Sequence, residues 1–428
     1  MAEPAIVELS VTVARERLWA DVMALAELTD PALPYTRRSF TPRFLTGREF
    51  LHGRFAEAGL TVRIDTAGNL IGRREGSKPG KGTLMIGSHS DTVPGGGRFD
   101  GIAGVLAGLE IARTLRERSI ELEYSLEIVD FLAEEPSVYG VSCVGSRGMS
   151  GCLEPGMLDL TGPGGERLAV ALRRVGGDPD QLDAAHRSDL VAFFELHIEQ
   201  GAVLEAGNTQ IGIVTGIVGI TRIEIEFTGE ADHAGTTPFS LRRDALVPAA
   251  RTIAMVRDIA ARLAEESNAY FIATVGVVKV EPGAANVVPR QATLIVDTRT
   301  SDRSLRERFI ADLAAGASEF AQEACVERSR FDVLSDSLPA QCDTALQELL
   351  RAGAERLGLS SRSLPSGAGH DAAFMTRLAP TAMVFIPCLK GKSHSPVEWT
   401  EPQQLADGTN TLLQAVLSLQ QANMGEVT

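Results

Sequence analysis

The segment GSHSDTVPGGGRFDG at residues 87–101 places one histidine and two aspartates among glycines, serines and a proline. His89, Asp91 and Asp100 carry side chains of the kinds that bind metal ions, and glycine lets a backbone approach a bound group closely. The segment is too rich in glycine to form regular structure. We therefore expect a loop that supplies ligands to a metal site, with further ligands coming from other parts of the chain.

Four β-favouring apolar runs each end in histidine or acidic residues. They are TLMIGSH (83–89), SLEIVDFLAEE (125–135), LVAFFELHIEQG (190–201) and TAMVFIPCLKGKSHSP (381–396). Continuous apolar runs are typical of strands covered on both faces, as in α/β sheets, where functional groups collect at the carboxyl ends of the strands. Together with the glycine-rich loop, these runs present the candidate ligands His89, Asp100, Glu134, Glu135, His197 and His394.

Imidazole and carboxylate ligands together suit zinc, manganese, cobalt or nickel, with zinc as the default. Five ligands and a spare carboxylate exceed the needs of one tetrahedral ion, but they would serve two ions about 3.5–4 Å apart that share an aspartate and a water. Glu134 and Glu135 are adjacent, and most such pairs are solvated in loops. At a buried strand end they would repel each other unless cations lay nearby. One glutamate would then bind metal and the other would act as a general base.

Two further motifs have simpler interpretations. GAGHDA at 367–372 fits the dinucleotide-binding pattern GxGxxA, but it lies late in the chain, outside a clear βαβ unit and without an acidic partner for a ribose. We do not expect a dinucleotide site there. In DHAGTTP (232–238) and DTR (297–299), His233 alone would be a turn residue and Arg299 a surface ion-pair partner. An arginine at a strand end also suits a substrate carboxylate, which it can hold through two hydrogen bonds.

The pattern of the chain changes between residue 212 and about residue 330, where the order of expected elements is β-α-β-β-α-β. This order matches a small open sheet with helices on one face. We expect an α/β catalytic domain with helices on both faces of a mixed sheet, formed by residues 1–211 and 332–428. An α+β ferredoxin-like domain, residues 212–331, would be inserted into it.

The composition, with 44% hydrophobic and 23% charged residues, is that of a globular protein. A formal net charge of −15 argues against nucleic acid and anionic membrane as partners. No apolar run reaches the roughly 18 residues of a membrane-spanning helix, and no signal-peptide pattern is found at the start. The five cysteines are scattered, which indicates reduced thiols. We expect a cytoplasmic protein.

Six motifs, taken in order, resemble those of the hydantoinase/carbamoylase amidases of the M20 metallopeptidase group. They are GSHSDTVPGGGRFDG, the Glu134–Glu135 pair, ELHIEQG, HAGTTP, NVVPRQATLIVDTR and SHSPVEW. The resemblance covers nearly the whole chain. It implies a homodimer, with a zinc-binding α/β domain and a smaller lid domain that mediates dimerisation. It also implies hydrolysis of the carbamoyl or ureido C–N bond of a small-molecule substrate, such as an N-carbamoyl-L-amino acid, with release of ammonia and CO2.

The resemblance also implies a role for each site residue. His89 and His197 would hold one ion, Glu135 and His394 the other, with Asp100 bridging the two. Glu134 would activate the bridging water, and Asp91 would orient the imidazole of His89. Substrate contacts are implied at Gln200, His233, Asn286, Arg299 and Gly369. Of these, His233 would reach across the dimer to stabilise the developing oxyanion, and Arg299 would grip the substrate carboxylate.

Several alternatives within and beyond this family stay open. The substrate could be allantoate, ureidoglycolate or β-ureidopropionate, or the chain could be an M20 aminoacylase or dipeptidase. His197 in ELHIEQG argues against the peptidases, which usually have an acidic ligand at this place. A non-catalytic binding protein of the same fold would be expected to lack a ligand, and all are present here. Pro136 replaces a glycine found after the glutamate pair in many members, and would stiffen the turn that aims Glu134.

Overall fold

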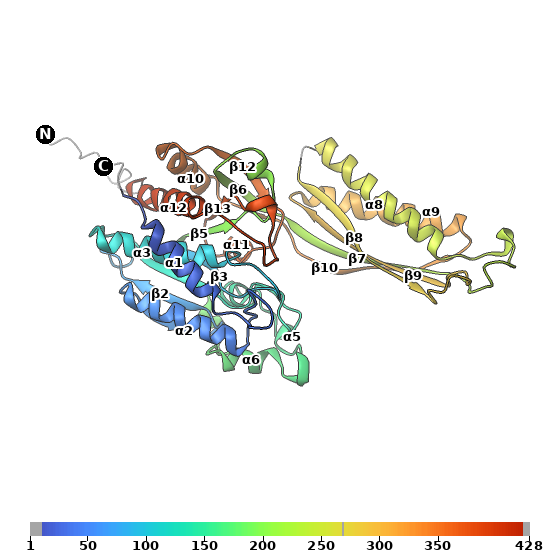
Figure 1. Ribbon diagram of the computed structural model, residues 1–428, viewed down its shortest axis with the longest axis horizontal. Helices are drawn as coiled ribbons and strands as arrows, with labels where there is room; N and C mark the ends of the chain where they lie inside the picture. The colour runs from blue at the N-terminus through green and yellow to red at the C-terminus, as the bar shows by residue number, and fades with distance from the viewer. Residues whose placement is uncertain (1–10, 268, 423–428) are drawn as a thin grey trace. The chain divides into compact units, whose positions relative to one another are not determined.

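The computed structural model describes residues 11–267 and 269–422, which form two compact units (Figure 1). The first unit holds the described residues up to Thr215, together with Gln341–Leu364 and those from His370 onward. The second holds Gly216–Ala340 and Pro365–Gly369. It extends beyond residue 331, the boundary expected from the sequence, because β10 (Glu327–Asp336) pairs along its length with β7 (Gly219–Thr228).

A mixed nine-stranded sheet, in the order β1-β2-β4-β3-β5-β13-β6-β11 with β12 also paired to β6, forms the centre of the first unit. The four apolar runs that we predicted as strands are neighbours in this sheet, and β4, β3, β5 and β13 all run parallel. Their carboxyl ends therefore lie at one edge of the sheet. The strands are β1 (Thr61–Ile64), β2 (Leu70–Arg74), β3 (Thr83–His89), β4 (Ser125–Phe131), β5 (Leu190–Ile198), β6 (Ile211–Ile217), β11 (Ala340–Gln341), β12 (Ser361–Ser366) and β13 (Thr381–Ile386).

Helices cover both faces of this sheet, as predicted. α3 (Ile102–Glu117) and α12 (Pro402–Ala422) pack on the face that carries Leu84 and Leu196. Glu195 points to the opposite face, where its carboxylate accepts a hydrogen bond from the first residue of α11 (Ala372–Met375). The other helices are α1 (Arg15–Ala26), α2 (Pro42–Glu57), α4 (Val144–Met149), α5 (Pro155–Leu158), α6 (Leu168–Arg174), α7 (Val203–Ala206) and α10 (Thr344–Arg356), with short 3-10 turns at Pro163–Gly165, Leu182–Ala185 and Leu389–Gly391.

The second unit has the predicted β-α-β-β-α-β order. Its elements are β7, α8 (Leu246–Ser267), β8 (Phe271–Glu281), β9 (Gln291–Thr300), α9 (Arg303–Glu323) and β10, with one 3-10 turn at Phe239–Leu241. The sheet is antiparallel throughout, in the order β10-β7-β9-β8. Buried residues alternate along β9, and its buried side chains pack with α8 and α9 in a core of their own. Among the residues described in both units, no helix is long and apolar enough to cross a membrane.

Candidate active site

The carboxyl ends of the parallel strands bring the predicted ligands together, as the sheet order requires. His89 is the last residue of β3, and His197 stands next to the last residue of β5. Asp100 ends the glycine-rich loop that leads from β3 to α3. The remaining ligand-type residues lie in the loops after β4 and β13, and they are Glu134, Glu135 and His394.

Two clusters of ligand atoms share Asp100. One contains His89 and His197, the other Glu135 and His394, and the ligand atoms within each cluster lie within 4.8 Å of one another. Oδ1 of Asp100 is 3.2 Å from Nε2 of His197 and 3.5 Å from Nε2 of His89. Oδ2 is 3.2 Å from Nε2 of His394, which is also 3.2 Å from Oε1 of Glu135. The two oxygens of one carboxylate thus face different clusters, as a bridging ligand requires.

Backbone carbonyl groups fix the tautomers of the two buried histidines. Nδ1 of His197 donates a hydrogen bond to the carbonyl oxygen of Ile198 at 2.9 Å. Nδ1 of His89 donates in the same way to the carbonyl oxygen of Asp91 at 3.1 Å. With a proton at Nδ1, Nε2 is the nitrogen left to bind a metal, and in both rings it lies on the side of Asp100. Nε2 of His197 also accepts a hydrogen bond from the backbone N–H of Gly101, at 3.1 Å.

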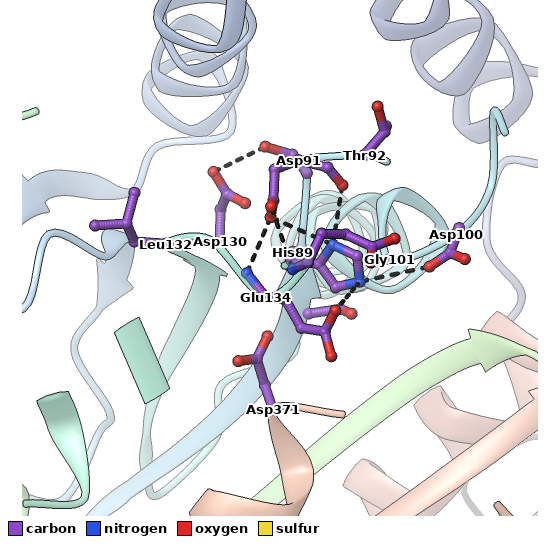
Figure 2. A network of polar contacts seen from close by, with 12 residues as sticks. His89, Asp91, Thr92, Asp100, Gly101, Asp130, Leu132, Glu134 and Asp371 are labelled. Carbon is purple, nitrogen blue, oxygen red and sulfur yellow. Dashed lines mark hydrogen bonds and ion pairs between the residues drawn. The ribbon is translucent and has the colours of Figure 1, made fainter. Parts of the chain in front are cut away.

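The carboxylate of Asp91 makes more contacts than the sequence predicts. Its Oδ1 lies 3.5 Å from Nδ1 of His89, the neighbour expected for it. The same carboxylate accepts hydrogen bonds from the backbone N–H groups of Glu134, at 3.1 Å, and Glu135, at 3.3 Å. Figure 2 shows Asp91 and Glu134 on either side of the His89 ring. One side chain therefore holds both the imidazole and the turn that carries the glutamate pair.

Glu134 has the surroundings of a general base. Its Oε2 lies 3.6 Å from Nε2 of His89, at the cluster that includes Asp100. Burial raises the pKa of Glu134 well above its usual value, and the negative charge of Glu135 adds to the increase. A carboxylate with a raised pKa takes up a proton more readily near neutral pH.

Cys143 contacts Glu134 and was not predicted. Its thiol lies 3.6 Å from Oε1 of Glu134, and its backbone N–H donates to the carbonyl oxygen of Glu134 at 2.9 Å. Cys143 belongs to PSVYGVSCVGSRG, the segment in which this chain departs from many members of the family it resembles. The segment after Pro136 therefore returns to the glutamate pair and packs against it. A lone cysteine gives no sign of such a contact in the sequence.

The carboxylates of the site are paired with histidines. Asp100, Glu134 and Glu135 are all buried. Within residues 11–267 and 269–422, the ion-pair partners of these three side chains are all histidines. Hydrogen bonds to the carboxylates of Asp100 and Glu135 raise the pKa of His394 to about 11. Such an excess of buried negative charge, offered by oxygen and nitrogen donors, fits divalent cations.

Gln200, predicted as a substrate contact, lies against the cluster in this structure. Its Nε2 donates hydrogen bonds to Oδ2 of Asp100, at 2.6 Å, and to Oγ of Ser393, at 3.2 Å. The backbone of Gln200 has a φ of 55°, in the left-handed region that is rare for residues other than glycine. His394 has a φ of 52°. Strained residues of this kind concentrate at functional sites.

The other four predicted substrate contacts belong to the second unit, where two of them gather at the end of β9. Nε of Arg299 donates to Oδ1 of Asp297 at 2.9 Å, and its Nη1 donates to the carbonyl oxygen of Gly367 at 2.8 Å. Gly369 lies two residues further along that segment. Arg299 and Gly369 are thus brought to the same end of the second sheet.

His233 and Asn286 lie at the other end of β9. His233 forms an isolated bridge with Val287, and the N–H of Ala234 donates to the carbonyl oxygen of Asn286 at 2.9 Å. Asn286 precedes the first residue of β9, whereas Arg299 is next to the last. A strand of 10 residues spans roughly 30 Å at about 3.4 Å per residue. The four residues therefore form two separate groups within one chain.

The GAGHDA segment contributes residues that the sequence interpretation missed. It leads into α11, which has only four residues and is too short for the helix of a dinucleotide site. His370 instead packs edge-on against His197, with ring centroids 4.5 Å apart. Asp371 accepts a hydrogen bond of 2.5 Å from the hydroxyl of Ser146 and lies on the Glu134 side of His89 (Figure 2). Their signal was their position directly after Gly369, an implied substrate contact, but we had considered the segment as a whole only as a nucleotide motif.

Known proteins match this chain over most of its length. Residues 85–418 match Peptidase family M20/M25/M40. An N-carbamoyl-L-amino acid amidohydrolase of Geobacillus stearothermophilus is 37% identical, with 95% of this chain and 98% of that protein covered. A ureidoglycolate hydrolase of Oryza sativa subsp. japonica is 34% identical, with 92% and 83% covered. The crystal structure of a hydantoinase/carbamoylase family amidase from Burkholderia multivorans superimposes with a TM-score of 0.87 at 37% identity, covering 96% of this chain and 98% of that one.

Proposed function

The chain belongs to Peptidase family M20/M25/M40, in its hydantoinase/carbamoylase branch, and from this premise we propose that it is a metal-dependent N-carbamoyl-L-amino acid hydrolase. At the coarser level it is a hydrolase of non-peptide C–N bonds, an amidohydrolase of ureido acids. The observation that carries the metal dependence is the position of Asp100, whose two carboxylate oxygens each lie 3.2 Å from a different histidine, His197 and His394. The choice of N-carbamoyl-L-amino acids is supported by the relatives with that activity.

In the proposed metal centre, His89 and His197 hold one ion, Glu135 and His394 hold the other, and Asp100 lies between them. Zinc is the proposed metal, and manganese, cobalt and nickel suit the same donors. When bound, two such cations supply Lewis acidity, which makes a water molecule more acidic and polarises the scissile carbonyl. The donor set fits this role because it offers imidazole nitrogens and carboxylate oxygens in two clusters with one shared member.

Glu134 is the proposed general base. Its carboxylate takes the proton from the water that attacks the carbamoyl carbon, and returns that proton to the nitrogen that leaves. Cleavage of this C–N bond releases the free amino acid and carbamic acid, which decomposes to CO2 and ammonia. Support comes from the burial of Glu134 and from its place beside His89, which together put a carboxylate with a raised pKa next to the proposed centre.

Arg299 and Gly369 are proposed to bind the carboxylate end of the substrate, and Gln200, His233 and Asn286 the remainder. Because His233 and Asn286 lie a strand length from Arg299, one chain cannot bring both groups to the same small molecule. We therefore propose a homodimer in which His233 of one protomer stabilises the oxyanion in the site of its partner. The second unit is then the lid and dimerisation domain. A cytoplasmic enzyme is proposed, because all five cysteines are free.

A substrate panel tests this proposal. Ammonia release is measured on N-carbamoyl-L- and D-amino acids, allantoate, ureidoglycolate, β-ureidopropionate and dipeptides, with and without zinc, manganese or cobalt. We expect metal-dependent turnover that is fastest for N-carbamoyl-L-amino acids. Fastest turnover of ureidoglycolate would move the assignment to the branch of the Oryza relative. Cleavage of dipeptides, detected with ninhydrin, or no turnover of any compound would refute the proposal.

A further inference from the structure

We propose that Glu398 is a positioning residue for the metal centre, holding the loop that carries Asp100 against the loop that carries His394. This inference rests on the proposed function, because it concerns the same centre. Glu398 is not among the predicted ligands, and its side chain is completely buried.

One oxygen of Glu398 holds the glycine-rich loop. Its Oε1 accepts hydrogen bonds from the backbone N–H groups of Phe99, at 2.8 Å, and Asp100, at 3.2 Å. These bonds fix the backbone from which the Asp100 side chain extends, and they come from a residue 298 positions later in the sequence. The direction of the Asp100 carboxylate therefore depends on where Glu398 lies.

The other oxygen of Glu398 holds the loop after β13. The hydroxyl of Ser393 lies 2.9 Å from Oε2 of Glu398 and 2.8 Å from Oδ2 of Asp100. Ser393 immediately precedes His394, whose imidazole faces the same oxygen of Asp100. Glu398 thus binds the backbone of Asp100 directly and contacts the side chain of Asp100 through Ser393. Because Ser393 is the residue before His394, the same contact also holds the backbone next to His394.

Gly97 leaves the space that the Glu398 carboxylate occupies. A Cβ atom at Gly97 would lie 1.9 Å from Oε1 and 2.0 Å from Cδ of Glu398, far inside contact distance. The φ of Gly97 lies outside the left-handed region, so its backbone conformation does not itself require glycine. Glycine is present at residue 97 because a side chain there would occupy the space of the Glu398 carboxylate.

A stabilising ion pair does not explain Glu398. In the described part of the chain no lysine or arginine forms an ion pair with its carboxylate, and Nη1 of Arg98 reaches only its backbone oxygen, at 3.4 Å. Burying a carboxylate without a cation is costly, and an apolar side chain of similar volume would be cheaper if packing were the only need. We therefore explain the burial of Glu398 by the hydrogen bonds that its carboxylate accepts from the two loops that carry Asp100 and His394.

Three variants test the inference. Glu398→Ala removes both links, and Gly97→Ala displaces the carboxylate without removing it. Glu398→Gln keeps an oxygen for the N–H groups of Phe99 and Asp100, and its amide group can donate to Ser393. We expect the two alanine variants to bind zinc about 10- to 100-fold more weakly than wild type, the size typical for residues that support metal ligands. The glutamine variant should bind close to wild type.

The readouts are the zinc affinity measured by chelator competition and the absorption spectrum of the cobalt-substituted protein, together with kcat and KM. Glu110→Ala is the matched control, because Glu110 is another fully buried carboxylate of the first unit, paired with Arg17. It should lower the melting temperature and leave zinc affinity unchanged. If Glu398→Ala does not fold, Gly97→Ala carries the test by itself.

The outcomes separate the two proposals. Wild-type zinc affinity and an unchanged cobalt spectrum in the folded alanine variants would overturn the positioning role, whatever the wild-type protein hydrolyses. A wild-type protein that binds two ions but hydrolyses no ureido acid would overturn the proposed function, while the zinc affinities still decide the role of Glu398. A wild-type protein that binds no transition metal would overturn both.

Discussion

The carboxylate of Asp91 accepts a hydrogen bond from the backbone N–H of Glu134, with 3.1 Å between the two atoms. This contact ties the second residue after β3 to the turn after β4, and these two strands are adjacent and parallel. Because the same side chain also faces His89, the proposed base and a proposed ligand share one support. Asp91 therefore holds the proposed base in place relative to the proposed ligand His89.

Asp91→Asn should show the importance of this support. The asparagine keeps one oxygen that can accept from the N–H of Glu134. Its NH2 group would then face the N–H of Glu135, and two donors cannot form a hydrogen bond. We expect kcat to fall about 10- to 100-fold, with weaker zinc binding, as is typical for residues that orient metal ligands. Steady-state kinetics and metal analysis on the same preparation measure both effects. Unchanged values for both would show that Asp91 supports neither group.

Glu134→Gln should keep the metals and lose the reaction. Glutamine has nearly the same shape, but it cannot take a proton from water. We expect metal content close to wild type and a kcat lower by about 100- to 10,000-fold, the usual contribution of a general base. Metal analysis together with turnover of an N-carbamoyl-L-amino acid measures this. Activity equal to wild type would remove Glu134 from its proposed role.

Removal of the metal ions should lower the melting temperature. Without cations, the buried carboxylates around Asp100 repel one another. A ligand present at 100 times its Kd stabilises the folded state by about 2.7 kcal/mol. For a chain of 428 residues that unfolds as a whole, this corresponds to a shift in melting temperature of roughly 3 °C. Thermal unfolding with and without a chelator measures the shift, and added zinc should reverse it. An Asp100→Asn variant should show little response to the chelator.

Metal binding should release protons. The pKa of His394 is raised to about 11 by its hydrogen bonds to Asp100 and Glu135, so the metal-free protein carries this proton at pH 7. An incoming cation must displace the proton, and a higher pH assists by removing it. The apparent zinc affinity should therefore rise with pH across the neutral range. Calorimetry in two buffers of different ionisation enthalpy counts the protons, and His394→Ala should release fewer than wild type.

Arg299→Ala should weaken the binding of substrates that carry a carboxylate. Nε and Nη1 of Arg299 are held by Asp297 and Gly367, which fixes the plane of the guanidinium group. Losing a hydrogen bond to a charged group costs about 1.5–3 kcal/mol, so we expect KM to rise about 10- to 100-fold with kcat less affected. Arg299→Lys should not restore KM, because an ammonium group lacks the planar pair of donors. An unchanged KM would exclude Arg299 from the substrate contacts.

The sheet could be predicted from the sequence because its central strands are continuous apolar runs. TLMIGSH, for example, is β3 from its first residue to its last, and every residue of it is buried. A strand of this kind needs cover on both faces, and that requirement alone places it inside an α/β sheet. The predicted boundary at residue 331 was less accurate, because β10 is mostly exposed and has no apolar run to mark its end.

The ligands could be predicted for a related reason, since each lies at the end of one of the parallel strands β3, β4, β5 and β13 or in the loop that follows it. Glu398, Ser393 and Cys143 could not be predicted in this way. Each acts through a contact with a residue far along the chain or around a turn, and no periodicity marks such a contact. The glutamate in SHSPVEW looks like a solvated loop residue until its hydrogen bond to Phe99, 299 residues earlier, is seen.

The position of β13 in the sheet has a consequence for biosynthesis. β13 lies between β5 and β6, although both of those strands are synthesised long before it. While a ribosome is still extending the chain, the sheet has an open slot, and His394 and Glu398 do not yet exist. The proposed ion that is held by Glu135, His394 and Asp100 can be captured only after the chain has been extended past His394, so the loading of that ion is a late step of maturation.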